Sequence, residues 1–431
     1  MTDNAVKDPY LRHLFDANPA FNVYNSELIN LSVGAPGPDL LKNCTDLLAQ
    51  STKHRLEEEE REGKYFLFQY GITSGLWECR NELSKFLSRR YGNVVARENL
   101  TLTAGATHGL QLILNTLLAP NGVIFVDEVT YMIALDVFKQ FSMLKITSVP
   151  MKNGVVNLDA LENLIEAEAH SRKVTVGDGK IFWAMYYAVP IFHNPTGMSL
   201  SPDASKRLAQ IAQKKDFLVV CDDVYNLLHY ETDQPPRRLF EFDDPKSADY
   251  RGGNIISNGS FSKILSPAIR VGWIESGPRI VSVLKESGIL KSGGAVNHYT
   301  SGLIASLLQL GLEDRHLDHL VTTYKERMRT LCDTLDGNLP SNCSYRRPAG
   351  GYFVWIELPE GCDADPFLKW CQERHKVLAI PGSRFSIEGK SRNYIRVSIG
   401  FHKAETIEKA ARILCNAISE YNKEKHPDIS T

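Results

Sequence analysis

The middle of the chain alternates short apolar runs with helical patterns, and this alternation restricts the fold more than any other feature. Seven runs are rich in β-branched or aromatic residues and end near Gly, Pro, Asp or Ser, which is typical of strands. They are LTLTAG, GVIFVDE, KITSVP, KIFWAMYYAVP, FLVVCDD, GNIISNGS and IRVGWIES. Helical stretches such as THGLQLILNTLLA and SPDASKRLAQIAQKK lie between most of them. The alternation predicts an α/β protein with a mainly parallel sheet and helices on both faces.

The pattern changes near residue 303, where long helices replace the alternation. DRHLDHLVTTYKERMRTLCDTLDGNL precedes three short strand-like runs, GGYFVWIEL, VLAI and NYIRVSIG, and a closing helix. We therefore expect a large domain at residues 56–302 and a smaller α+β domain at residues 303–431. An N-terminal segment, residues 1–55, is expected to join the small domain and the substrate site. The charged run RLEEEEREGK near Glu58 is interpreted as a solvated linker or helix face.

Composition argues against several classes of function. The formal net charge of -2 provides no basic excess for binding phosphate backbones, so no nucleic-acid partner is expected. No apolar run reaches the length of about 18 residues that a membrane helix needs. The eight cysteines stand singly without C-x-x-C, which favours buried, reduced thiols over disulfides or a zinc site. The first residues lack a signal-peptide core, so we expect a cytoplasmic protein without a metal.

Open α/β sheets bind ligands beyond the carboxyl ends of their strands, so we examined the residues that follow each strand. Gly105, Ala106 and Thr107 follow LTLT and open a helix, whose N-terminus favours an anion. An ordinary helix cap would use the same residues. Tyr131 follows GVIFVDEVT and can stack on a planar ring or simply pack at a helix start.

Two further polar residues follow strands. Asn194 begins the turn NPTG, which presents its amide at the mouth of the sheet, although an ordinary turn would look the same. Asp222 ends the apolar run FLVVCD and is expected to be buried. A buried carboxylate needs a cation or donor, or its pKa rises. Asp222 can therefore cap the next helix or act as counter-ion of a protonated ring nitrogen.

The stretch NGSFSKILSPAIRVGW combines an amine with groups that bind anions. Lys263 follows a strand end, and a lysine in a partly desolvated pocket can form a Schiff base with an aldehyde. Arg270 can fork onto phosphate oxygens, to which Ser260 and Ser262 can donate. A solvated loop is the alternative, but the flanking Gly, Ser and Pro residues fit it poorly. An aldehyde with a phosphate and a ring nitrogen describes pyridoxal 5′-phosphate.

Eight motifs occur in one order between about Asn30 and His402. They are LSVGAPGPD, FQYGITSGL, TAGATHGL, EVTY, NPTG, DDVY, SFSK followed by SPAIRVGW, and NYIRVSIG. In these motifs the chain resembles the pyridoxal-phosphate-dependent aminotransferases of class I/II, and most closely the group acting on 2-aminoadipate, aromatic amino acids or kynurenine. The resemblance implies fold type I, with a mainly parallel seven-stranded sheet between helices and a smaller α+β domain.

The resemblance also implies roles for individual residues. Lys263 would hold the cofactor covalently and then move the proton at the substrate Cα, and Asp222 would pair with the pyridinium nitrogen. Tyr225 and Asn194 would hydrogen-bond the phenolate oxygen. The remaining cofactor contacts would come from Gly105, Ala106, Thr107, Tyr131, Ser260, Ser262 and Arg270, and from Tyr70 of a neighbouring subunit. Gly34, Asn194 and Arg396 would bind the substrate, with Arg396 clamping its α-carboxylate.

Reaction and specificity are also implied by the resemblance. We expect a homodimeric aminotransferase that moves an amino group from 2-aminoadipate, an aromatic amino acid or a kynurenine-like donor to a 2-oxo acid such as 2-oxoglutarate. A cysteine-conjugate β-lyase on the same scaffold is the alternative. A transcriptional regulator is disfavoured because no winged-helix module precedes the domain, and an idle scaffold because the lysine is present. His193 stands where the related group usually has Gln, and we expect it near the ring of the cofactor.

Overall fold

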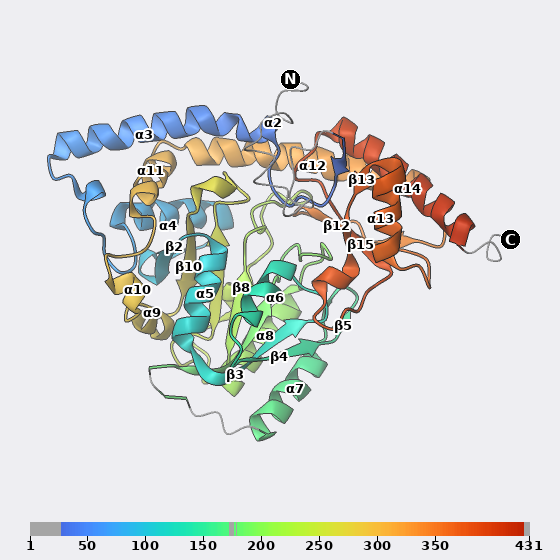
Figure 1. The fold of residues 1–431 in the computed structure, drawn as a ribbon. Coiled ribbons are helices and arrows are strands. Elements are labelled where there is room, and N and C mark those ends of the chain that lie inside the picture. The colour runs from blue at the N-terminus through green and yellow to red at the C-terminus, as the bar shows by residue number, and fades with distance from the viewer. Residues whose placement is uncertain (1–26, 172–175, 178, 426–431) are drawn as a thin grey trace.

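A seven-stranded sheet lies at the centre of the protein, described here from a computed structural model that covers residues 27–171, 176–177 and 179–425. Its strand order is β2-β10-β9-β8-β7-β3-β4 (Figure 1). The strands are β2 (Leu100–Thr103), β3 (Leu118–Asp127), β4 (Lys145–Val149), β7 (Phe182–Ala188), β8 (Leu218–Asp222), β9 (Ile255–Ser260) and β10 (Gly272–Ser276). β10 runs antiparallel to β2 and β9, and the other pairs are parallel. The predicted α/β fold with a mainly parallel sheet is confirmed.

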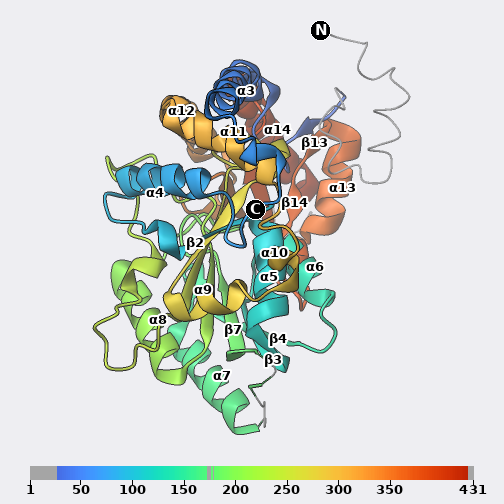
Figure 2. The same ribbon diagram turned by 90° about the vertical axis from the view of Figure 1, so that its left-hand side faces the viewer.

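Helices cover both faces of this sheet. One face packs against α4, α5, α6, α9 and α11, and the other against α7 and α8 (Figure 2). These helices span Trp77–Tyr91 (α4), Ala106–Leu117 (α5), Met132–Lys139 (α6), Leu158–Ser171 (α7), Pro202–Lys215 (α8), Pro278–Leu284 (α9) and His298–Gln309 (α11), with a short α10 at Gly288–Lys291. Every residue of β8 and β9 is buried. Burial on both faces explains why apolar and polar residues do not alternate along the central strands.

Local signals fix where the helices begin. The Ser201 side chain caps α8 by accepting a hydrogen bond from the Ala204 amide at 3.2 Å, and Pro202 occupies the first turn. Gly105 precedes α5 with a φ of 86°, a left-handed value that a glycine adopts without strain. Only Ala104 and Gly105 therefore separate β2 from α5, and the N-terminus of α5 lies at the edge of the sheet.

A smaller α+β region follows. Its antiparallel sheet has the order β11-β12-β15-β14, formed by Ser344–Tyr345, Phe353–Glu357, Tyr394–Ser398 and Ile380–Pro381. The accompanying helices are α12 (Leu312–Asn338), α13 (Ala364–His375) and α14 (Ala404–Lys425). Figure 1 shows α12 along the upper edge of the molecule beside α3 (Asn43–Glu62), reaching toward α14 at the right.

Residues 29–41 attach to this smaller region. β1 (Ile29–Asn30) pairs in parallel with β13 (Val377–Leu378), and the Ser398 amide donates to the Leu31 carbonyl at 2.8 Å. Asp39, in the short helix α2 (Pro38–Leu41), accepts a 2.5 Å hydrogen bond from Arg327. The intervening residues, Gly34 among them, are thereby held beside the ligand edge of the sheet. The short strands β5 (Met151–Lys152) and β6 (Val155–Val156) form a separate antiparallel hairpin.

The charged run RLEEEEREGK lies mainly in α3, where Glu57, Glu60 and Glu62 are exposed as expected of a helix face. Arg55 and Glu59 are instead buried and ion-paired, so part of this run is structural. The expected boundaries at 55/56 and 302/303 fall inside α3 and α11, and the division into domains stays a prediction. The first part of the N-terminal segment that we expected to join the small domain and the substrate site, residues 1–26, lies outside the described residues.

Within the described residues, no helix combines the length and apolar character needed to cross a membrane. Seven of the eight cysteines are buried, and the eighth, Cys343, is partly exposed.

Candidate active site

A cavity of about 650 Å³ opens where the sheet, the smaller region and residues 32–35 meet. It lies beyond the carboxyl ends of β7, β8 and β9, where an α/β sheet is expected to bind its ligand. Twelve of the residues singled out in the sequence line it: Gly34, Ala106, Thr107, Tyr131, Asn194, Asp222, Tyr225, Ser260, Ser262, Lys263, Arg270 and Arg396. The fold thus brings together residues that are up to 362 positions apart, from Gly34 to Arg396.

Lys263 contributes an amine to the wall of this cavity. It follows β9 by three residues, and its Nζ donates a 2.6 Å hydrogen bond to the Gly34 carbonyl. Removal from water lowers the pKa of Lys263 to about 8, because burial disfavours the charged ammonium. A larger side chain at position 34 is excluded, since a Cβ there would lie 2.8 Å from Cζ of Phe353. Gly34 therefore lets the backbone approach the amine closely.

Asp222 is the carboxylate that lines the cavity. It ends β8, is buried, and accepts a 2.6 Å hydrogen bond from the Tyr187 hydroxyl through Oδ2. Its other oxygen, Oδ1, is buried without a hydrogen-bond partner among the described residues. Burial raises the pKa of Asp222 to about 6, because desolvation disfavours the carboxylate. The orphaned oxygen marks a place where a ligand that donates a hydrogen bond would be satisfied.

A cradle for an anion lies at the N-terminus of α5. The Arg270 guanidinium reaches across it, with nitrogens 3.5 Å from the Ser262 hydroxyl and 3.3 Å from the Ala104 carbonyl. Ser260 and Ser262 lie beside it and are linked by a 2.9 Å hydroxyl hydrogen bond. Gly105 does not line the cavity directly, but a Cβ there would lie 3.0 Å from Arg270 Nη2. Cation, hydroxyls and free helix amides together suit a phosphate group.

Arg396 lies at the opposite wall, on β15. It is buried, and it donates hydrogen bonds to Asn194 Oδ1 at 2.8 Å and to the Ser32 carbonyl at 2.7 Å. Its guanidinium carbon lies 4.0 Å from the centroid of the Phe353 ring. Burial lowers the pKa of Arg396 to about 10, which still leaves it charged at neutral pH. Its Nε remains without a partner among the described residues, so it can still bind an anion.

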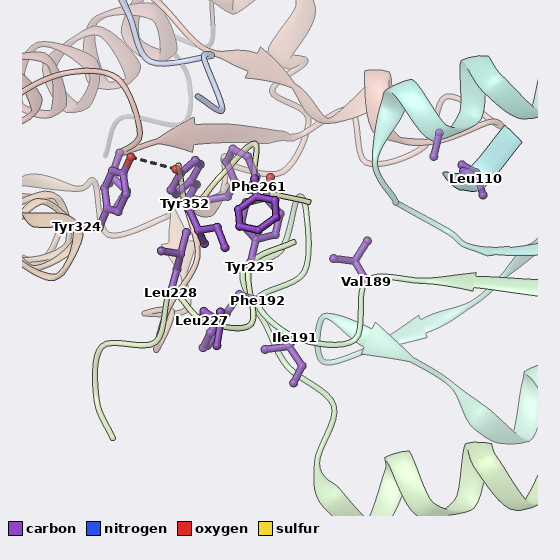
Figure 3. Close-up of a cluster of buried hydrophobic side chains, with 14 of the residues drawn as sticks. Leu110, Val189, Ile191, Phe192, Tyr225, Leu227, Leu228, Phe261, Tyr324 and Tyr352 are labelled. Carbon is purple, nitrogen blue, oxygen red and sulfur yellow. Dashed lines mark hydrogen bonds between the residues drawn. The ribbon is translucent and has the colours of Figure 1, made fainter. Parts of the chain in front are cut away.

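Two tyrosines complete the polar lining. Burial raises the pKa of Tyr131 to about 12 and that of Tyr225 well above its usual value, so both hydroxyls stay protonated donors. Figure 3 shows Tyr225 in a buried cluster with Phe261 and Tyr352, and the dashed line joins the Tyr352 and Tyr324 hydroxyls. Tyr352 also donates a 3.0 Å hydrogen bond to the Lys263 carbonyl, so this cluster fixes the backbone that carries the amine.

Tyr70 is not part of the cavity in a single chain. Tyr70 is 83% exposed. Its ring packs against the backbone of Gly293, so that a Cβ added at Gly293 would lie 2.7 Å from the Tyr70 ring. Neighbouring apolar residues are exposed as well: Tyr65, Phe66, Phe68, Ile72 and Tyr299, which with Tyr70 we call the aromatic patch. A patch of this kind on a folded chain is typical of a protein interface.

His193 lies elsewhere than we expected from the sequence. Its ring is buried away from the main cavity, with Nδ1 3.0 Å from the Thr196 hydroxyl and Nε2 3.4 Å from Asp127. The next residue, Asn194, lines the cavity instead. Because adjacent residues of this turn face opposite ways, the expectation that His193 lies beside the ligand is wrong.

Several lining residues were not identified from the sequence. Tyr187 lies in the uniformly apolar run KIFWAMYYAVP. Only the alternation of strand side chains between the two faces of the sheet would have distinguished it from Tyr186. Phe353 and Arg384 come from the smaller region, and their approach depends on long-range packing. Arg384 did carry a signal, since it is a cation in a Pro-Gly-rich turn before β15, as Arg270 is before β10.

This fold and this set of groups define a fold type I aminotransferase. The family described as "Aminotransferase class I and II" matches residues 26–414, and the chain belongs to this family. Both the predicted family and the predicted fold type are confirmed.

Individual relatives share its full length at moderate identity. "Aromatic-amino-acid aminotransferase 1" of Thermococcus litoralis is 28% identical over 402 residues, which cover 92% of this chain and 89% of the relative. The "2-aminoadipate transaminase" of Thermus thermophilus is 28% identical over 393 residues, covering 91% and 90%. The crystal structure of the kynurenine aminotransferase of Pyrococcus horikoshii superposes with a TM-score of 0.79 at 26% identity, covering 98% of this chain and 97% of that one.

Proposed function

We propose that the protein is a pyridoxal-phosphate-dependent aminotransferase that uses 2-aminoadipate, an aromatic amino acid or a kynurenine-like compound as donor and 2-oxoglutarate as acceptor. The observation that carries this proposal is the arrangement of three groups around one cavity: the Lys263 amine, the orphaned Asp222 oxygen and the Arg270 cradle. These groups fit the aldehyde, ring nitrogen and phosphate of the cofactor respectively. The named relatives support the substrate classes.

The residues of this chain then have distinct tasks. When bound, the cofactor supplies an aldehyde for covalent attachment and a ring that withdraws electrons from the substrate Cα. Lys263 would hold the aldehyde of the cofactor and would move the proton at the substrate Cα; its pKa of about 8 provides neutral amine near physiological pH. Asp222 would accept a hydrogen bond from the protonated ring nitrogen, which would satisfy its free oxygen.

Other residues orient the two ligands. Asn194 and Tyr225 would donate toward the phenolate oxygen, and Tyr131 would pack against the ring. Arg396 binds the substrate α-carboxylate with its remaining hydrogen-bonding capacity, while Asn194 and the Ser32 carbonyl hold the guanidinium in place. This separates an anion site for the cofactor, at Arg270, from one for the substrate, at Arg396.

We also propose a homodimer in which Tyr70 contributes to the phosphate site of the partner subunit. The exposure of Tyr70 and of the aromatic patch supports this role. No observation on the described residues favours the cysteine-conjugate β-lyase over the aminotransferase.

Replacement of the lysine tests the proposal directly. Lys263→Ala is expected to lower transamination by more than about a thousandfold and to abolish the visible absorbance of lysine-bound cofactor, because no other side chain supplies the amine. Lys285→Ala, at an exposed lysine outside the cavity, is the matched control and should stay within about twofold of the wild type. The far-ultraviolet circular dichroism spectrum should be unchanged in both variants. Activity of Lys263→Ala within about tenfold of the wild type would refute the proposal.

A further inference from the structure

One cationic side chain of the cavity has no assigned partner once the cofactor and an α-carboxylate are in place. Among the described residues, the lining has four cationic side chains, Lys263, Arg270, Arg384 and Arg396, but one carboxylate, Asp222. The proposed function assigns Arg270 to the phosphate and Arg396 to the α-carboxylate, and it pairs Asp222 with the ring nitrogen. Arg384 is left without a partner. An unpaired cation in a binding cavity favours a further anionic group on the ligand.

Arg384 also lacks a partner within the protein. It lies in the 3₁₀ turn η7 (Gly382–Phe385), and its side chain makes no ion pair or hydrogen bond in the part of the chain that the structure describes. Other arginines of this region differ: Arg392 is ion-paired with Asp363, and Arg374 with Glu424. The guanidinium of Arg384 is therefore free to bind a ligand without first breaking an internal contact.

The backbone of Arg384 is held firmly on the substrate side of the cavity. The next residue, Phe385, is fully buried, and its ring centroid lies 4.9 Å from the guanidinium carbon of Arg396. The Phe385 carbonyl accepts a 2.9 Å hydrogen bond from the Thr130 amide, next to Tyr131. Arg384 is thus tied to the α-carboxylate wall, while the phosphate cradle lies at α5. Its position suits the far end of a substrate.

The surface near the two arginines is apolar. Ile380 lies opposite Arg396 in the register of β14 and β15, and Met132 and Ile133 contribute from α6. Apolar walls accept methylene groups or an aromatic ring, but they cannot satisfy a charge. A substrate with two carboxylates joined by a short chain would place its chain on this surface and its charges on the two arginines.

We propose that Arg384 binds the second carboxylate of a dicarboxylic substrate, so that it selects dicarboxylic 2-oxo acids and amino acids over monocarboxylic ones. The inference rests on the proposed function for the assignment of the other three charges. Arginine suits this task because its planar fork can donate two hydrogen bonds to one carboxylate. Monocarboxylic donors would use the apolar surface alone and leave Arg384 in water.

The first test compares two acceptors that differ at one end only. 2-Oxovalerate has a methyl group where 2-oxoglutarate has its second carboxylate. In Arg384→Gln holoenzyme, KM for 2-oxoglutarate should rise about 10- to 100-fold at nearly unchanged kcat, and kinetics with 2-oxovalerate should stay within about twofold. The KM of Arg384→Lys for 2-oxoglutarate should lie between those of the wild type and Arg384→Gln, because lysine keeps the charge but cannot donate two parallel hydrogen bonds to one carboxylate. Arg392→Gln removes the same charge from an exposed site outside the cavity and should match the wild type.

A binding measurement gives a readout that does not depend on turnover. Glutarate should bind the wild-type holoenzyme more tightly than valerate in isothermal titration calorimetry, and Arg384→Gln should remove about tenfold of the glutarate affinity while leaving valerate unchanged. Equal losses for both acids, or no loss for glutarate, would overturn the inference and leave the aminotransferase proposal intact. Absence of transamination by the wild type with every acceptor would instead refute the proposed function, and the glutarate comparison would still decide whether Arg384 binds a carboxylate.

Discussion

Three charged side chains of the site are buried where charge is disfavoured. Burial moves the pKa of Lys263 to about 8, of Asp222 to about 6 and of Arg396 to about 10, each toward its neutral form. Asp222 and Arg396 also keep an atom without a hydrogen-bond partner among the described residues. Such groups cost stability in the free protein and are typical of sites that a ligand completes. The site is therefore arranged for its ligands rather than for the stability of the fold.

Asp222 allows this cost to be measured. Asp222→Asn keeps an acceptor for the Tyr187 hydroxyl but removes the buried charge, so at pH 8 it should increase the free energy of unfolding of the cofactor-free protein by about 3 kcal/mol. It should also abolish most of the transaminase activity. Urea unfolding of both proteins gives the difference.

The pH dependence of that difference has a definite sign. The folded-state pKa of Asp222 is raised from 3.8 to about 6, so wild-type stability falls as pH rises through this interval. The advantage of Asp222→Asn should therefore be small near pH 3.5 and complete above pH 7. A variant that is less stable than the wild type at pH 8 would contradict the account of a desolvated carboxylate.

The sequence correctly predicted cavity residues that directly follow strands. It did not predict residues whose side-chain orientation depends on the packing of distant parts of the chain. Asp222 and Lys263 were found because each ends or closely follows a continuous apolar run. The orientation of His193 could not be predicted, because neighbouring residues of one turn line different cavities and no local pattern tells which of them faces the ligand. Arg384 reaches the cavity only because the smaller region folds back over the sheet.

At the scale of elements, the start of α5 connects backbone conformation to anion binding. Gly105 has a left-handed φ of 86° and leaves room for the Arg270 guanidinium. A Cβ at this position would add backbone strain and press on Arg270 at 3.0 Å. The loop before α5 therefore requires glycine for two separate reasons.

Gly105→Ala should weaken cofactor binding about tenfold or more, because the added methyl group displaces Arg270 from the phosphate cradle. Gly63→Ala is the matched control: Gly63 also has a left-handed φ, of 65°, but a Cβ there would meet no atom within 4 Å. Both variants should lose about 1 kcal/mol of stability, and only Gly105→Ala should lose cofactor in equilibrium dialysis. Equal cofactor retention by the two variants would show that crowding at Arg270 is unimportant.

Elements were predictable where local signals were strong. The seven strands of the sheet were found because each is an apolar run with a clear boundary, and α8 because Ser201 and Pro202 mark its start. The pairing of β1 with β13 was not predicted, since two-residue strands separated by more than 340 positions have no local signature. The buried Arg55–Glu59 pair within an acidic run was missed for a similar reason, because its burial depends on α11 and the segment around Leu67.

For the whole molecule, the aromatic patch is the feature that a single chain leaves unexplained. Phe68 is 61% exposed and stacks on Tyr299, with ring centroids 6.1 Å apart, beside the exposed Tyr70. Exposed aromatic side chains at this density favour burial against a second subunit. If Tyr70 completes the partner's phosphate site, then assembly and cofactor binding are coupled.

Phe68→Asp should convert the proposed dimer to a monomer and weaken cofactor retention, because it would place a charge in the proposed apolar interface. Met143→Asp is the matched control, since Met143 is 62% exposed and lies before β4, at the edge of the sheet opposite β2. Analytical ultracentrifugation at several concentrations gives the mass of each. A wild-type protein that is a fully active monomer would contradict the role of Tyr70.

The measurement that tests the central claim most directly is an absorbance titration of the cofactor-loaded protein with single amino acids in the absence of any 2-oxo acid. The account predicts that 2-aminoadipate, an aromatic amino acid or kynurenine converts the visible band of lysine-bound cofactor to the absorbance of the aminated cofactor, with one equivalent of 2-oxo acid released per site. Addition of 2-oxoglutarate should then restore the original band. A band that no amino acid changes, or one that persists while pyruvate accumulates from a cysteine conjugate, would contradict the account and in the second case would identify a lyase.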